Sequence, residues 1–293
     1  MTDLFDTWSL LAAASKLVLY ASSLVAVGSL LFAIAMPRVG VAVAGALRRL
    51  AIGATLLAIA ATVVRVMVQG GRMLDEWAGM TDPDILMISL DGPLGASTGV
   101  RLAGLGLLLL AALVRPLRGP ATLVGAVLVA GSFALTGHAT RAPQWALGGL
   151  VTIHLLALAY WVGALAPLYR LAGASDDRRR AAEIAERFGR QASVVVPVLV
   201  LAGAGFAYVL LGGLVPLVTA GYGQVLLAKL GLVALVLGIA ALNKWRFVPA
   251  LASGGAEAGF RFRRALALEA LAFVAVFAMT AVMTTSFTVP EAA

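Results

Sequence analysis

Methionine and histidine are the side chains in this sequence best suited to binding a soft metal, because the chain contains no cysteine. Thioether sulfur is a soft, uncharged ligand that suits Cu(I) and competes poorly for hard cations. Six methionines lie where the chain is predicted to leave the membrane on one side, and a single methionine is more often a packing residue. The candidate capture site consists of Met67, Met73, Met80, Met87, Met279 and Met283, the last two one helical turn apart.

The two histidines are the second candidate set. His138 follows a predicted span in the segment Thr136-Gly137-His138-Ala139. His154 lies within the next apolar run, roughly 13 Å below its outer end and close to mid-bilayer. Imidazole binds copper and haem and carries protons, and a polar ring at this depth needs a partner inside the bundle. Trp161 follows seven residues later on the same helix face. The alternatives are a packing histidine at 154 and a surface histidine at 138.

The segments that carry these residues are predicted to be membrane-spanning helices. The chain is 61% apolar and 12% charged, with a mean hydropathy of +0.99, so it has too little polar surface for a water-soluble protein. Apolar runs of about twenty residues recur and predict an all-α, polytopic bundle, residues 1–293 forming a single membrane domain. The eight predicted spans are 9–35, 50–69, 96–114, 120–137, 145–169, 192–213, 222–243 and 265–287.

Basic residues set the predicted orientation. Alternate loops hold sixteen of the 22 Lys and Arg residues, which places these loops in the cytoplasm and both termini outside it. This topology accounts for the net charge of +8 without a nucleic-acid partner. The predicted cytoplasmic loops are about 36–49, 170–191 and 244–264.

The longest outer loop, about residues 70–95, is acidic, with five carboxylates against a single Arg72. Met73, Trp77 and Met80 are spaced as on one side of a helix, which predicts a short helix at the membrane surface. Such a helix would present sulfur to an arriving metal. The alternative is an ordinary interfacial anchor.

Cations inside the predicted spans form a third set. Lys16 and Lys229 lie well within spans one and seven, while Arg65 and Arg101 lie nearer the outer surface, where long side chains can reach water. No carboxylate is expected at the depth of these lysines. They could hold an anion, tether the acidic loop or repel cations. No nucleotide-binding loop, zinc-protease motif or activated nucleophile is found, so an enzyme is not expected.

Several short motifs occur in the same order as in a known family. They are His154-Leu155 with Trp161-x-Gly163-x-Leu165, then Tyr222-Gly223, Leu226-Leu227-Ala228-Lys229-Leu230, and Asn243 with Pro249. Together with Lys16, Arg101 and Gly137-His138-Ala139, this pattern resembles the copper resistance protein D (CopD) family. Lys244 follows Asn243 where the family has arginine, which is a departure from the pattern.

The resemblance implies a bacterial inner-membrane protein of eight helices that moves or handles copper, often beside a periplasmic CopC-like copper-binding protein. It makes His138 and His154 metal-site candidates. Lys16, Arg101 and Lys229 become framework residues without an assigned role.

These observations lead to the hypothesis that copper, as Cu(I) or Cu(II), is captured at the outer face and passes to His138 and then to His154. One rival is a redox module with haem between the two histidines, although bis-histidine ligation needs imidazoles at similar depth. A second is an anion carrier that uses Lys16 and Lys229. A third is a non-transporting scaffold for periplasmic copper chaperones.

Overall fold

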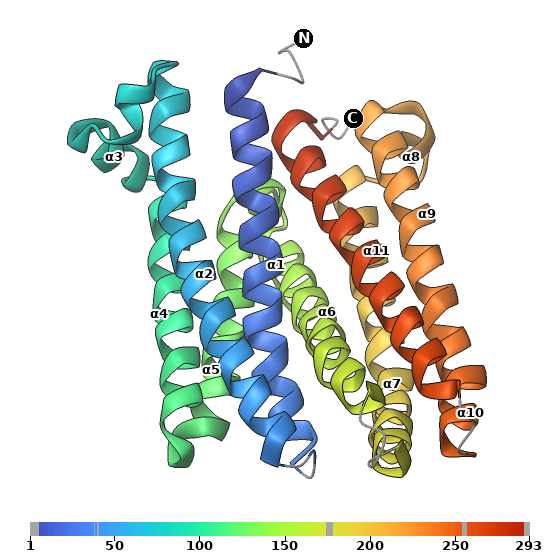
Figure 1. The fold of residues 1–293 in the computed structure, drawn as a ribbon. Helices are drawn as coiled ribbons and strands as arrows, with labels where there is room; N and C mark the ends of the chain where they lie inside the picture. The colour runs from blue at the N-terminus through green and yellow to red at the C-terminus, as the bar shows by residue number, and fades with distance from the viewer. Residues whose placement is uncertain (1–5, 38, 40, 174–177, 254–256, 290–293) are drawn as a thin grey trace.

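The chain folds into a bundle of eight long helices, drawn in Figure 1. The computed structural model describes residues 6–37, 39, 41–173, 178–253 and 257–289. No strand occurs among these residues, so the all-α prediction and the eight spans are confirmed. The long helices are α1 (Thr7–Ala35), α2 (Val41–Leu74), α4 (Pro93–Leu113), α5 (Arg118–Ser132), α6 (Gln144–Gly173), α7 (Arg178–Leu211), α9 (Gly221–Leu242) and α11 (Ala258–Ser286).

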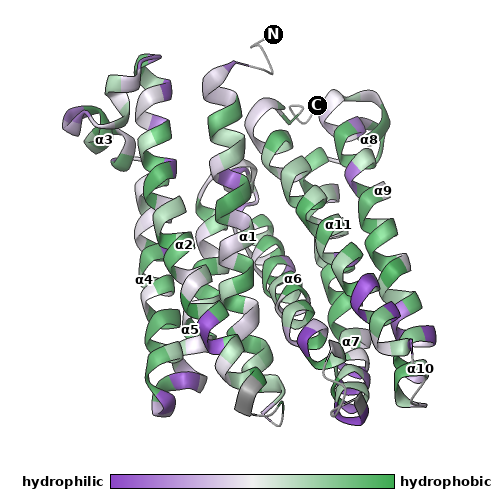
Figure 2. Cartoon of the chain, in the orientation of Figure 1, coloured by the Kyte–Doolittle hydropathy of each residue, from purple (hydrophilic) through white to green (hydrophobic). Residues whose placement is uncertain are grey.

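Shorter elements join or extend the long helices. Hydrophobic residues cover most of the bundle, and hydrophilic residues gather toward its two ends (Figure 2). We call the end at which α1 begins and α11 ends the outer end, following the orientation predicted from the basic residues. The short elements are η1 (Trp77–Met80), α3 (Pro83–Leu90), η2 (Arg115–Leu117), η3 (Phe133–Leu135), η4 (Gly137–Thr140), α8 (Val215–Thr219), η6 (Asn243–Phe247) and α10 (Val248–Ala252).

The outer segment between α2 and α4 does not form the single helix predicted for Met73, Trp77 and Met80. Helix α2 continues to Leu74, and Asp75 then adopts a positive φ of 56°, which ends the helix. Trp77 starts the separate 3-10 helix η1, and its ring packs on that of Trp8 with centroids 5.0 Å apart. The predicted shared face is therefore wrong, because the chain turns between the first and second residues of the pattern.

At the opposite, inner end the helices are longer than hydropathy predicted. Helix α2 already begins at Val41, and α7 begins at Arg178, so much of the predicted loops 36–49 and 170–191 is helical. The loop predicted at 244–264 is also largely helical, because η6, α10 and the start of α11 fall within it. Pairs of charged residues four positions apart, such as Arg190 with Glu186 at 2.9 Å, stabilise the polar turns of α7.

Helix α1 packs closely against α6 at the centre of the bundle. Gly28 and Gly163 meet at this crossing, and a Cβ atom on Gly163 would lie 2.0 Å from the carbonyl carbon of Gly28. Only glycine therefore permits this approach of the two backbones. The crossing brings α6 into the interior, where it also packs against α5, α7 and α11.

Candidate functional site

His154 lies on α6 and is half-buried against α7. Its Nδ1 atom is 2.9 Å from the backbone carbonyl oxygen of Leu199. Gly203, one turn further along α7, leaves room for the ring, because a Cβ atom there would come within 2.8 Å of Nδ1 and Cε1. Two features of α7, a carbonyl group and a missing side chain, thus fix the position of the imidazole.

This contact determines how His154 can react. A carbonyl oxygen only accepts hydrogen bonds, so Nδ1 must carry the proton and donate it. In the neutral ring, Nε2 then keeps its lone pair and is the atom able to bind a metal or accept a proton. Lys229 on α9 is close enough to act on His154 electrostatically. A positive charge on Lys229 opposes the binding of a cation at the imidazole.

The other histidine, His138, belongs to the backbone of η4, six residues before α6 begins. Its side chain lies outside the described residues. His154 lies ten residues inside α6, which places it roughly 15 Å along the helix axis from the start of α6 at Gln144. Passage of a metal from His138 to His154 stays a prediction.

The six outer methionines divide into two groups, with α1 between them (Figure 1). Met67, Met73, Met80 and Met87 belong to α2 and the outer segment, whereas Met279 and Met283 belong to α11. Helix α1 packs against both α2 and α11. The methionines are consequently two candidate sets and not one continuous cluster.

Within the first methionine group, exposure varies. Met87 is 65% exposed and Met73 46% exposed, and the Met73 sulfur accepts a hydrogen bond of 3.2 Å from Ser89 Oγ. Met67 and Met80 are half-buried, and Met80 packs close to Gly71. The first group therefore has two exposed methionine residues, Met73 and Met87, at the outer end.

On α11, Met283 is only 4% exposed and packs in an apolar cluster with Leu147 and Tyr222, while Met279 is half-buried. The burial of Met283 is the arrangement expected of a packing residue. Within the described part of the chain, no three His, Asp or Glu residues gather into a metal-binding group. Any metal site among the described side chains must therefore use methionine sulfur or fewer than three His, Asp and Glu ligands.

Trp161 takes part in a buried network that the sequence analysis did not predict. Its indole Nε1 donates to Glu269 Oε1 at 2.6 Å, and Asn243 Nδ2 donates to Glu269 Oε2 at 2.7 Å. Glu269 is 2% exposed and lies on α11, so the network joins α6, α11 and η6. A lone glutamate within an apolar span was the sequence signal, since intramembrane carboxylates are costly and need partners.

Two of the four cations predicted inside the spans, Lys16 and Arg101, donate hydrogen bonds to neutral groups. Lys16 Nζ donates to the Thr284 carbonyl oxygen at 2.7 Å, and Arg101 donates to the hydroxyl groups of Ser97 and Ser132. Lys229 forms no hydrogen bond or ion pair with another described residue. Lys16 and Arg101 line one outer cavity together with Arg65.

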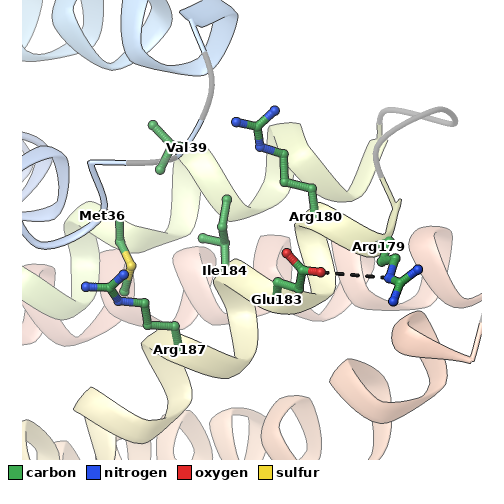
Figure 3. A pocket seen from close by; sticks show the side chains of 7 residues that line it. All are labelled: Met36, Val39, Arg179, Arg180, Glu183, Ile184 and Arg187. Carbon is green, nitrogen blue, oxygen red and sulfur yellow. Dashed lines mark ion pairs between the residues drawn. The ribbon is translucent and has the colours of Figure 1, made fainter.

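A second cavity, of about 540 Å³, lies at the inner end between α7 and the connection from α1 to α2. Figure 3 shows Met36 and Val39 from that connection facing Arg187 and Ile184 of α7. Arg179 Nε and Glu183 Oε1, which also line it, are 3.8 Å apart. This inner cavity contains none of the predicted metal ligands.

Two family models match the chain. The model described as "Copper resistance protein D-like, N-terminal domain" matches residues 1–149, and the model described as "Copper resistance protein D" matches residues 182–283. The chain belongs to the copper resistance protein D family. It is thus a multi-pass membrane protein of a family related to copper resistance. The searches of curated proteins and of solved structures find no match.

The two matched ranges divide the candidate residues of this CopD-family chain. Lys16, Arg101 and His138 lie in the N-terminal range, while Lys229 and the α11 methionines lie in the C-terminal range. His154 and Trp161 lie between the two ranges. The family match therefore supports the resemblance noted in the segment from Tyr222 to Pro249, whereas the candidate role of His154 is supported by the contacts of its ring with α7.

Proposed function

We propose that this CopD-family chain transports copper across the bacterial inner membrane, capturing it at the periplasmic, outer end. The observation that carries the proposal is the held imidazole of His154. Its Nδ1 atom is fixed on the Leu199 carbonyl oxygen at 2.9 Å, which leaves Nε2 available within the bundle. A neutral imidazole nitrogen is a ligand for both Cu(I) and Cu(II).

The outer methionines supply the first step of this proposal. Met73 and Met87 have exposed side chains at the end where copper would arrive, and their sulfur atoms suit Cu(I). From there the metal would pass to His138 and then inward to His154. Met279 and Met283 form the alternative entry on the other side of α1.

Copper accumulation in cells that express the protein tests this path. We expect His154→Ala to reduce accumulation strongly, because no other described histidine side chain can replace its Nε2 atom. Ile153→Ala is the matched control, since the neighbouring residue is 48% exposed on the same helix and should leave accumulation unchanged. Equal accumulation in wild type and in the His154, Met73 and paired Met279 and Met283 variants would contradict transport.

The same purified protein distinguishes the rivals. Bound copper without a Soret band supports a copper site, whereas a Soret band that depends on both histidines would indicate haem. Copper binding at the outer end without any flux would indicate a scaffold for a periplasmic CopC-like protein. The acidic outer segment is the surface on which we place such a partner.

A further inference from the structure

The outer half of the bundle contains a cavity of about 360 Å³ whose charged lining is entirely basic. It lies between α1, α2, the outer segment and α4, and it receives one cation from each of the three long helices: Lys16, Arg65 and Arg101. Tyr20 and Gln69 add polar groups. None of the residues lining this cavity is an aspartate or a glutamate.

Arg101 is a rigid part of this cavity. It is 3% exposed, its Nε donates to Ser132 Oγ at 3.0 Å, and its Nη2 donates to Ser97 Oγ at 2.8 Å. Its guanidinium carbon lies 4.4 Å from the centre of the Phe133 ring. These contacts hold the charge in place, but all of them are with uncharged groups, so the positive charge is not neutralised.

The other two cations also lack a counter-charge among the described residues. Lys16 Nζ is held by the carbonyl oxygen of Thr284 at 2.7 Å and by its hydroxyl oxygen at 3.4 Å. The Nη1 atom of Arg65 is buried without any hydrogen-bond partner in the described part of the chain. A buried cation is costly unless an opposite charge and hydrogen-bond acceptors compensate it.

We propose that this cavity binds an anion through a phosphate group, which accepts hydrogen bonds from Arg65 and is neutralised by all three cations. Guanidinium groups match the planar arrangement of two phosphate oxygens, and an ammonium adds a point charge. These cations would repel a bare copper ion. Met73, which belongs to the proposed copper path, also lines the cavity, but the anion site rests on the three cations and does not depend on copper transport.

The depth of the cavity suits a lipid phosphate as well as a free anion. Helix α1 has 29 residues and is therefore about 44 Å long, which exceeds the hydrocarbon layer of about 30 Å by roughly 7 Å at each end. Lys16 lies about 13 Å below the start of α1, hence only about 6 Å inside the hydrocarbon boundary. A headgroup phosphate or a dissolved phosphate can both approach this level.

The inner cavity of Figure 3 differs in this respect. It also holds three arginines, but Glu183 lies among them and its carboxylate oxygen is 3.8 Å from Arg179. The Arg179 side chain is 94% exposed, so water solvates its charge. Of these two basic cavities, only the outer one combines buried cations, a lining without carboxylates and a guanidinium nitrogen that has no hydrogen-bond partner among the described residues.

The test measures phosphate binding to the full chain purified in detergent. One arm uses radiolabelled inorganic phosphate, and the other uses native mass spectrometry with phosphatidylglycerol, compared with uncharged diacylglycerol. Arg65→Gln removes the unpartnered cation, and Lys16→Met provides a second variant if the first folds poorly. Arg49→Gln is the matched control, because Arg49 is an exposed cation at the inner end of the same helix.

We expect saturable binding of at least one probe, weakened by about tenfold or more in Arg65→Gln and unchanged in Arg49→Gln. Retention of inorganic phosphate identifies a free anion, and retention of phosphatidylglycerol alone identifies a headgroup site. Binding of neither probe, or equal binding by wild type and both cavity variants, would overturn the proposal and leave the cations as a barrier to cation leakage.

Discussion

Replacement of Glu269 by leucine tests the buried network most directly. The substitution removes both acceptors, so Trp161 Nε1 and Asn243 Nδ2 lose hydrogen bonds of 2.6 and 2.7 Å. Side-chain hydrogen bonds between membrane helices contribute about 0.6 kcal/mol each, and a stranded buried donor costs about 1–3 kcal/mol. The free energy of unfolding should therefore fall by roughly 1–6 kcal/mol for the two donors together.

Glu269→Gln separates hydrogen bonding from charge. The glutamine keeps one acceptor oxygen for Trp161, and the buried Asn243 Oδ1 atom, which has no partner among the described residues, can turn to accept from the new amide. We expect Glu269→Gln to unfold close to the wild-type temperature.

Thermal unfolding in detergent, followed by tryptophan fluorescence, measures these differences. Glu257→Leu is the control, because Glu257 pairs with Arg261 at the exposed start of α11 and such pairs contribute little. Unchanged unfolding in Glu269→Leu, or equal losses in the leucine and glutamine variants, would refute the role assigned to the network.

Two glycine substitutions test close approaches. Gly163→Ala should reduce the yield of folded protein in size-exclusion chromatography, because its Cβ would lie 2.0 Å from the α1 backbone. Overpacking of this kind costs about 1–3 kcal/mol or more. Gly238→Ala is the control, because Gly238 has open space around it. Gly203→Ala should displace the His154 ring and lower copper accumulation. Gly205→Ala, whose Cβ would meet its nearest atom at 3.5 Å, should leave accumulation unchanged, and equal values in the two variants would argue against a role for the held imidazole.

The sequence predicted the number and order of the membrane helices, because twenty apolar residues in lipid have few alternatives to a helix. It did not predict how far α7 extends at the inner end. The segment from Arg178 to Arg190 is too polar for a hydropathy window, yet its alanine, arginine and glutamate residues favour helix and form pairs four residues apart. Hydropathy reports solvation by lipid and not helical conformation, so it ends the span too early.

The candidate site was less predictable, because hydropathy does not state which helices are neighbours. Trp161 and Glu269 are 108 residues apart, and their hydrogen bond depends on the packing of α6 against α11. The end of α2 before Asp75 was also missed. The spacing of Met73, Trp77 and Met80 is helical, but the backbone leaves the helical conformation at Asp75. The partner of Lys16 is a backbone carbonyl, a group that every residue carries and that no sequence motif marks.

The π-helix η6 carries Asn243 into the Glu269 network at the inner end of α9. A π turn holds one residue more than an α turn, so it has the form of a single-residue insertion in an otherwise continuous rod. Deletion of one residue there would rotate α10 by about 100° relative to α9. Val248 and Leu251, now buried, would then swing out of the interior, so the wide turn sets the angular register between the long helix and its short continuation.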